Sequence, residues 1–494
     1  MKVFLLSFFI FSNIHNSTAQ LYYHYDNEVR LIYEDIISLK FERAHHSISS
    51  YPDQDNLALV HLKSYIDFFS LFINENKDLY NQVYHHKEKY LDQLAAGDSD
   101  SPYHKFIKAE ILLQWALIDI KFDKKLKAGK AIFQAYKLLE SNKDRFPLFI
   151  ENNKSLSVIH VLARSLPSWV KTLLGIEGSL AMGRREILEI KDFALKNPSF
   201  FFREEVAAIN SYILFYQTNE KPLAMKDLEA FNLEYKSSPL LAFLKASMAL
   251  RNGNNNDCIK ILESCITDKE QSPFYYLDFM LGRSLLFARD KRAKQYLLNY
   301  VNSFEGQHFI KEAYQKLAWF ELILNDNLDG YYYYMELCER KGNSLVDEDK
   351  QALREAELKS APNTILLEAR LLFDGGYYHQ AFNFLQANSE IELDNEAESI
   401  EFNYRMGRTL QALGRTKESL LVFANVIDAS KGESKHYKVG NAALQMGLIY
   451  EELGDYNSAK YYYDYCLNQD FDLYKNSIEQ KAKSGLQRIK DFSK

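Results

Sequence analysis

The chain has 494 residues, of which 47% are hydrophobic and 26% are charged, so it is long enough for several structural units and too apolar to be disordered. Its formal net charge of −7 gives no general attraction for nucleic acid, and we expect no nucleic-acid partner. Only 9 prolines and 19 glycines interrupt this length, which favours long stretches of helix.

Residues 1–19 have the pattern of a secretory signal peptide. Lys2 precedes an apolar run from Val3 to Ile14, and Ser17 to Ala19 supply the small residues that a signal peptidase reads. The run is short for a membrane span, although a cleaved signal and a retained anchor both agree with it. No cysteine lies near the cleavage site for a lipoprotein anchor. We therefore predict an exported protein, periplasmic or secreted, with no integral membrane span once the signal is removed.

The four cysteines are predicted to be small, buried packing residues. Cys258 and Cys265 are seven positions apart on one predicted helix, about 10 Å along its axis, which is beyond the reach of a disulfide. Cys338 and Cys466 lie far apart in the chain. So few cysteines in an exported chain favour a bacterial periplasm over an animal extracellular space.

Residues 20–165 are helical by pattern but have no regular repeat. The apolar periodicity predicts helices over 28–50, 56–74, 77–95, 103–122 and 124–141. The segment Asp98 to Pro102 is a clear break, and Pro102 suits the first turn of the next helix. We interpret this region as degenerate repeats or as a helical cap.

From residue 166 to 475 a pair of small residues recurs at a fixed spacing. Gly407 and Gly447 are each followed by a small residue after twelve positions and an aromatic residue after sixteen: Ser419 and Phe423, and Ala459 and Tyr463. We call Gly407 and Gly447 the anchors of their repeats. Upstream, the equivalent anchor positions are Ala369, Ala318, Gly282, Ala246, Tyr212 and Gly178. From Gly178 onward the spacings are 34, 34, 36, 36, 51, 38 and 40, with an inserted loop and an extra helical turn expected in the longest step.

This period near 34, with small residues where two helices would cross, resembles the tetratricopeptide repeat family. The resemblance is strongest over 362–473, although the usual Trp is replaced by Asn403 and Ala443. It implies an all-α fold, a right-handed superhelical solenoid of antiparallel helix pairs. Residues 476–494 are predicted to form a polar amphipathic helix that caps the last repeat.

Other motifs are better explained by packing than by chemistry. Gly178 and Gly183 have the glycine spacing of a phosphate-binding loop, but arginines stand where that loop needs Lys and Ser or Thr, and Gly183 is expected in a turn between helices. The pairs His45-His46 and His85-His86 lack the spacing of helical zinc ligands. We find no catalytic motif, and predict a non-enzymatic protein with no cofactor or metal.

The tyrosine runs Tyr331–Tyr334 and Tyr461–Tyr463 are interpreted chiefly as packing residues. One ring of each run, Tyr334 and Tyr463, falls on the predicted packing stripe, while its neighbours point elsewhere on the helix. Ligand stacking by those neighbours is the alternative.

The candidate binding residues follow directly after the anchors. The position after the small residue faces the concave groove in the tetratricopeptide family, so the resemblance implies a column of side chains there, namely Arg283, Trp319, Arg370 and Arg408, joined by Tyr404 and Gln411. Arginine forks suit carboxylates, so the groove is expected to bind an acidic peptide or a chain terminus. The alternative for these arginines is internal pairing with acidic neighbours such as Glu368 or Glu401.

The leading hypothesis is an exported, non-enzymatic scaffold that binds a protein or peptide. The alternative is a glycan-binding protein, because signal, length and aromatic content resemble those of the starch-utilisation binding proteins of the outer membrane. Those proteins are typically lipoproteins, and their repeats are interrupted by a large ligand domain, whereas here the repeat continues to the C-terminus.

Overall fold

A computed structural model describes residues 21–163, 178–266, 268–389, 393, 395–429, 436–471 and 473–490. The predicted signal peptide lies outside the described residues. Within the described ranges, helices account for all of the regular structure apart from one isolated β-bridge between Tyr22 and Asn56. None of the described helices combines the length and the apolarity that crossing a membrane would require.

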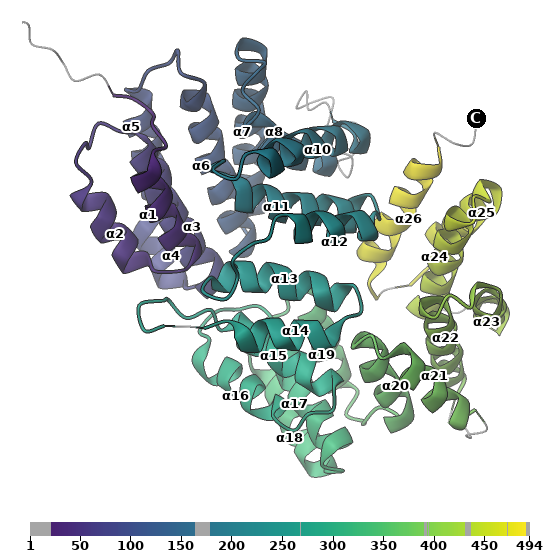
Figure 1. Cartoon of the computed structure of the whole chain (residues 1–494). Coiled ribbons are helices and arrows are strands. Elements are labelled where there is room, and N and C mark those ends of the chain that lie inside the picture. The colour runs from purple at the N-terminus through teal and green to yellow at the C-terminus, as the bar shows by residue number, and fades with distance from the viewer. Residues whose placement is uncertain are drawn as a thin grey trace, which may run out of the picture.

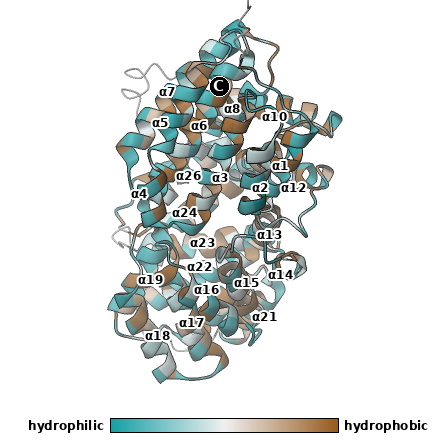
Figure 2. Ribbon diagram, turned by 90° about the vertical axis from the view of Figure 1, so that its left-hand side faces the viewer, coloured by the Kyte–Doolittle hydropathy of each residue, from teal (hydrophilic) through white to brown (hydrophobic). Residues whose placement is uncertain are grey.

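The helices pack mainly against their neighbours in sequence and follow a curved path, on which the C-terminal helices return toward α12 (Figure 1). Most of them carry both hydrophilic and hydrophobic residues, as expected for helices that are buried on one side (Figure 2). In chain order the helices are α1 (Asn27–Ile37), α2 (Phe41–Ser50), α3 (Ala58–Asn74), α4 (Lys77–Val83), α5 (His86–Ala95), α6 (Pro102–Lys121), α7 (Lys125–Arg145), α8 (Asn152–Ala163), α10 (Leu180–Lys196), α11 (Arg203–Tyr212), the π-helical turn η1 (Ile213–Gln217), α12 (Lys221–Ala230), α13 (Pro239–Arg251), α14 (Asn255–Ser264), α15 (Tyr276–Phe287), α16 (Ala293–Ser303), α17 (Ile310–Leu324), α18 (Leu328–Arg340), α19 (Asp347–Glu357), α20 (Thr364–Asp374), α21 (Tyr378–Ala387), α22 (Glu396–Ala412), α23 (Thr416–Ala429), α24 (Tyr437–Glu452), α25 (Tyr456–Leu467) and α26 (Lys475–Ile489).

The predicted anchor contacts occur in the two C-terminal pairs, α22–α23 and α24–α25. A Cβ atom placed on Gly407 would lie 2.7 Å from the Phe423 ring, and one on Gly447 would lie 2.6 Å from the Tyr463 ring. The Ser419 hydroxyl donates to the Gly407 carbonyl oxygen at 2.8 Å. The small residue therefore lets the second helix approach the backbone of the first, and the aromatic residue fills the crossing.

The pair α15–α16 follows the same rule with a register shifted by one residue. Gly282 contacts Leu297, fifteen positions later, rather than the predicted Leu298. Ala293, Leu297 and Tyr300 form the buried stripe, each with 0% exposure, in place of positions 294, 298 and 301. The distance from the anchor to the second helix is thus one residue shorter here, which the fixed spacing of the sequence pattern misses.

The assignment of Gly178 as an anchor is wrong. Gly178 precedes α10, whereas an anchor lies inside the first helix of a pair. Gly183 lies inside α10 and not in a turn: a Cβ there would meet the Ser157 carbonyl oxygen of α8 at 2.5 Å. α10 is therefore the second helix of a pair with α8. The intervening residues 164–177 lie outside the described residues.

The inserted segment before α20 contains a complete helix, α19, rather than one extra turn. It packs against α17 and α18. The Asp349 carboxylate accepts hydrogen bonds from the backbone N–H groups of Phe309 and Glu312, at 2.7 and 3.0 Å, and so caps the first turn of α17. Three of the four cysteines are buried as predicted, whereas Cys265 is half-buried.

The N-terminal region packs back onto the middle of the chain. The predicted helix over 28–50 is divided into α1 and α2 at Leu39, which has a φ of 61°, and the Leu39 carbonyl accepts the Ser272 N–H at 2.9 Å. Glu75, at the end of α3, accepts the N–H groups of Gln307 and His308 at 2.9 and 3.0 Å. Segments more than 230 residues apart in the sequence are thereby held together.

A buried ionic cluster joins five helices of this region. The Lys154 ammonium group of α8 lies 2.6 Å from both Glu110 on α6 and Glu205 on α11. The hydroxyls of Tyr33 on α1 and Tyr65 on α3 donate to Glu205 at 3.0 and 2.6 Å. Because removal of one partner would leave a buried charge uncompensated, this cluster fixes the relative positions of these helices.

We predict that Gly447→Ala lowers the free energy of unfolding by about 1–3 kcal/mol, because the new methyl group overpacks the crossing. Tyr463 cannot easily retreat, since the same ring also lies against Gly485. Gly129, in α7, has no neighbouring atom within 4 Å of an added Cβ. Gly129→Ala is the matched control, and is expected to raise stability by about 0.5–1 kcal/mol. Urea denaturation measures both, and equal effects would contradict the crossing contact.

We also predict that acid weakens the contact between α3 and the loop before α17. Burial opposes the charge of Glu75, but His308 and Lys121 outweigh it and lower its pKa to about 2. A lowered folded-state pKa means that the stabilisation, about 3 kcal/mol, is present above the unfolded value near 4.5 and is lost as the pH falls toward 2. The stability difference between wild type and Glu75→Gln should therefore shrink between pH 6 and pH 3. The exposed Glu88 is the control position, where Glu88→Gln should show no such change.

Candidate functional site

The inner side of the curve carries a groove of about 590 Å³ between α17, α19, α20, α22 and α24. The helices α20, α22, α24 and α26 contact one another in succession along it. A side pocket of about 210 Å³ adjoins the groove and reaches α26. The residues common to the inner groove and the side pocket are Arg370, Arg405, Tyr437, Lys438 and Tyr474.

Trp319 and Arg370 are stacked together in the groove wall. The Arg370 guanidinium carbon lies 4.7 Å from the centroid of the Trp319 ring, and the Lys316 ammonium group lies 3.8 Å from it. Trp319 is 1% exposed, and its Nε1–H donates to Glu355 Oε1 at 2.6 Å. Arg370 also lies 3.5 Å from the Asp374 carboxylate. The ring orients the arginine, and Asp374 partly neutralises its charge.

Arg408 is a cation in the side pocket without a carboxylate partner among the described residues. Its guanidinium carbon lies 5.0 Å from the centroid of the Phe373 ring, and Nη1 donates to the Tyr404 hydroxyl at 3.1 Å. The Nε atom is buried and has no protein partner in the described part of the chain. An arginine fixed by rings retains its donors for a ligand.

Glu401 neutralises two other cations at the junction of groove and pocket. It forms ion pairs with Arg405 and Lys438, and the Lys438 ammonium group lies 2.6 Å from Glu401 Oε2. Burial opposes the charge of Glu401, but these two cations outweigh it and hold its pKa well below the usual range. Burial lowers the pKa of Lys438 against the attraction of Glu401, and the short contact favours the charged ammonium.

The structure places two of the predicted site residues away from this arrangement. Arg283 lies 3.7 Å from Glu312 and 5.2 Å from the Phe279 ring centroid, and does not line the groove or the side pocket. Gln411 is half-buried, and its Oε1 atom has no partner among the described residues. Trp319 and Arg370 line the groove, and Arg370, Tyr404 and Arg408 line the side pocket.

Internal pairing, the alternative for these arginines, occurs for Arg283 with Glu312 and for Arg370 with Asp374, but not with the suggested Glu368 or Glu401. Glu368 pairs instead with Arg289, which lies in the turn after α15. Glu401 forms ion pairs with Arg405 and Lys438 instead, and Arg408 has no carboxylate partner among the described residues.

The sequence pattern missed three residues that complete the site: Tyr437, Tyr474 and Lys481. Tyr437 begins α24, ten residues before the anchor Gly447, whereas the column was sought directly after the anchor. Tyr474 precedes α26 and has a left-handed backbone conformation, with a φ of 57°. No residue pattern in the sequence predicts that conformation. Lys481 belongs to the helix predicted only as a polar cap, and an amphipathic pattern could not tell that its polar side would face a pocket.

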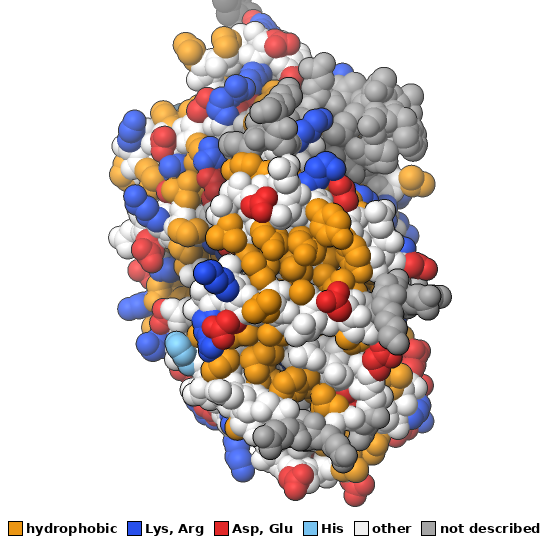
Figure 3. Space-filling model, turned by 90° about the vertical axis from the view of Figure 1, so that its right-hand side faces the viewer, with side chains coloured by type: hydrophobic (Ala, Val, Ile, Leu, Met, Phe, Trp, Pro, Cys, Tyr) orange, Lys and Arg blue, Asp and Glu red, His pale blue; other side chains and the backbone are white. Residues whose placement is uncertain are grey.

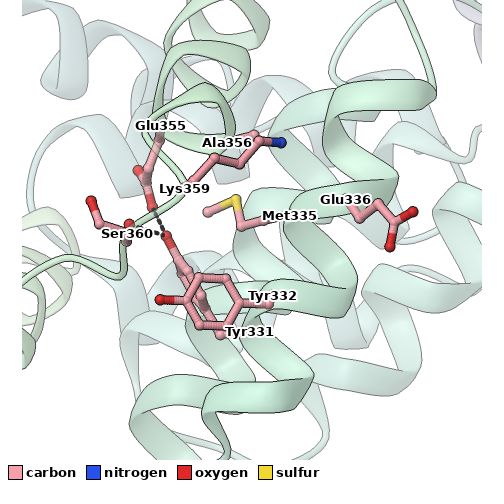
Figure 4. Close-up of a pocket in the computed structure, with 8 residues that line it drawn as sticks. All are labelled: Tyr331, Tyr332, Met335, Glu336, Glu355, Ala356, Lys359 and Ser360. Atoms are coloured by element: carbon pink, nitrogen blue, oxygen red, sulfur yellow. Dashed lines mark hydrogen bonds between the residues drawn. The ribbon is translucent and has the colours of Figure 1, made fainter.

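A further pocket of about 250 Å³ lies between α18 and α19 (Figure 4). Its charged side chains already have partners: Tyr331 donates to Glu355 at 3.3 Å, Lys359 pairs with Glu339, and Glu336 pairs with Arg340. We therefore assign it no ligand. In the described residues no group of three His, Cys, Asp or Glu side chains is arranged to hold a metal ion.

No protein-family model matches the chain, and no curated protein matches it in sequence. The site must therefore be interpreted from its own geometry.

We predict that Glu355→Ala destabilises the groove wall by about 2–3 kcal/mol, because the buried Trp319 and Gln315 donors, both 2.6 Å from its carboxylate, lose their acceptor. Glu336→Ala, on the exposed face of α18, removes only a surface ion pair and should change stability by less than about 0.5 kcal/mol. Denaturant unfolding of the two variants checks this, and a near-neutral Glu355→Ala would contradict the described hydrogen bonds.

Proposed function

We propose that this chain is an exported, non-enzymatic scaffold, periplasmic or secreted, that binds an acidic segment of a partner protein or peptide in the inner groove. We also propose that its helix pairs are tetratricopeptide-like units coiled with a right-handed twist. The contacts of Gly407 with Phe423 and of Gly447 with Tyr463 support this family assignment.

The observation that carries the binding proposal is the excess of positive charge in the side pocket at the end of the groove, since the inner groove itself is lined by four carboxylates and four cationic residues. The side pocket is lined by five cationic residues and the Asp374 carboxylate; the cationic residues are Arg370, Arg405, Arg408, Lys438 and Lys481. Glu401 pairs with Arg405 and Lys438, and Asp374 lies near Arg370, so Arg408 and Lys481 carry the excess. The whole chain, in contrast, has a net charge of −7. An acidic segment would be attracted here and repelled by much of the remaining surface.

The aromatic walls supply the second element of recognition. Tyr404, Tyr437, Tyr474 and Phe373 line the side pocket beside the cations. When a ligand binds, such rings bury apolar area and lose little side-chain freedom, because most of them are already packed against the protein. A preformed groove of this kind binds an extended segment without first ordering itself.

A role without catalysis is supported by the state of two carboxylates in the groove. Glu355 accepts hydrogen bonds from Trp319, Gln315 and Tyr331, and Glu401 is held by Arg405 and Lys438. Groups committed in this way are poorly placed to accept a proton from a substrate.

We predict that replacing both Arg370 and Arg408 by Gln weakens the binding of a labelled oligo-glutamate peptide at least tenfold, because two arginine forks are lost from the pocket. Fluorescence anisotropy at about 0.15 M salt measures the affinity. Arg340→Gln, on the exposed surface of α18, is the matched control and should bind as the wild type does. Equal affinity of the double variant and the wild type would refute the groove as the acidic-peptide site.

One observation favours glycan binding as a second candidate. The face that carries α23 and α25 exposes a broad field of hydrophobic side chains (Figure 3). Leu421 is 68% and Tyr461 62% exposed, and Tyr462 stacks with Tyr450 at an interplanar angle of 1°. Exposed tyrosine rings can stack against sugars. Binding to a polysaccharide panel that is lost in Tyr461→Ala would support this candidate, and absence of binding by the pure wild-type protein would dispose of it.

A further inference from the structure

The side pocket is too small to hold a whole ligand by itself. Its volume of about 210 Å³ lies below the range of about 300–1,000 Å³ that is typical of ligand pockets, whereas the adjoining inner groove, at about 590 Å³, lies within that range. The two cavities share part of their walls, including Arg370, Tyr437 and Tyr474. A ligand that enters the side pocket is therefore expected to continue into the inner groove.

The inner groove differs from the side pocket in its charge. It is lined by equal numbers of cationic residues and carboxylates, four of each, and one of these carboxylates, Glu401, pairs with Arg405 and Lys438. Because the opposite charges balance, the inner groove offers no net attraction to acidic residues. Acidic residues of a ligand are therefore attracted to the side pocket, where Arg408 and Lys481 carry an excess of positive charge.

The inner groove supplies accessible apolar surface instead. Leu366 and Leu367 belong to its wall and are each 4% exposed. Leu358, directly after α19, is 72% exposed, and Pro362 and Leu473 are half-buried. Apolar surface of this kind is removed from water when the apolar side chains of a ligand cover it, and that burial favours binding.

We propose that the inner groove and the side pocket together bind a two-part segment, whose apolar residues cover the groove beside Leu358 and whose neighbouring acidic side chains enter the side pocket. This inference rests on the proposed function and deepens it, because it adds an apolar part to the acidic segment and gives the two parts an order. Charge complementarity places the acidic part between α22 and α26 and the apolar part along α19 and α20.

The side pocket suits two acidic side chains rather than one. The Arg408 guanidinium carbon lies 5.0 Å from the Phe373 ring centroid, and its Nε atom has no protein partner in the described part of the chain. Lys481 lines the same pocket from α26. An arginine fork can bind one carboxylate with two hydrogen bonds, and a lysine can attract a second as a point charge.

Labelled peptides of equal charge test the apolar part. One has three leucines followed by three glutamates, and the other has serines in place of the leucines. Fluorescence anisotropy with the full chain at about 0.15 M salt should give the leucine peptide an affinity about tenfold higher or more, because apolar burial adds to the same ionic contacts. A third peptide, in which leucine and glutamate alternate, should lose most of this advantage, and equal affinity of the block and alternating peptides would contradict the two-part site.

Leu358→Ser removes apolar surface from the inner groove. It should reduce the advantage of the leucine peptide to about threefold or less, while the serine peptide binds as it does to the wild type. Leu421→Ser is the matched control, because Leu421 is 68% exposed but lies on α23, on the outer hydrophobic face (Figure 3), and should leave both affinities unchanged. Equal Tm values of the two variants would show that both fold. An undiminished advantage in Leu358→Ser, or its loss in Leu421→Ser, would overturn the proposal.

The inference and the proposed function fail by different results. Arg408→Gln should weaken the binding of both the leucine and the serine peptide by a similar factor, about fivefold or more, because both share the acidic part. If both peptides bind and the leucines add nothing, the two-part site is wrong and the acidic-peptide site stands. If neither peptide binds, or if Arg408→Gln binds both as the wild type does, the proposed function fails and this inference fails with it.

Discussion

The close crossing of two helices at a residue without a side chain is the contact on which the rest of this structure depends. Gly447 receives the ring of Tyr463, and Gly407 receives that of Phe423. Because this crossing recurs, successive first helices lie next to one another. The groove is a consequence of that repetition: Arg370 and Arg408 follow Ala369 and Gly407 directly, and both reach the side pocket.

The sequence predicted the repeating part of the fold because its determinants are local. An anchor and its partner lie within about 20 residues, so one period reveals both. The same reasoning misassigned Gly178, since a glycine that contacts α8 from just before α10 has the same residue identity as an anchor. It also missed the shortened connection in α15–α16, although Lys294 at the expected small position, directly after the buried Ala293, was a sign of it.

The site was predicted only where it follows from the repeat. The column supplied Trp319, Arg370 and Arg408, but it also included Arg283, which instead lies beside Glu312. Tyr474 and Lys481 complete the side pocket and come from the end of the chain. They reach the pocket because the row of helices is curved, and that curvature depends on all the helices together. The docking of Glu75 onto the loop before α17 is equally invisible in sequence, because it joins segments 232 residues apart.

The central claim is that the inner surface, rather than the outer one, receives an acidic partner. Hydrogen–deuterium exchange of the full chain, with and without a saturating oligo-glutamate peptide, tests it most directly. We expect slower exchange in α20, α22, α24 and the first turn of α26, and unchanged exchange in α23 and α25. Protection confined to α23 and α25, or absent from both sets while the peptide is bound, would contradict the account.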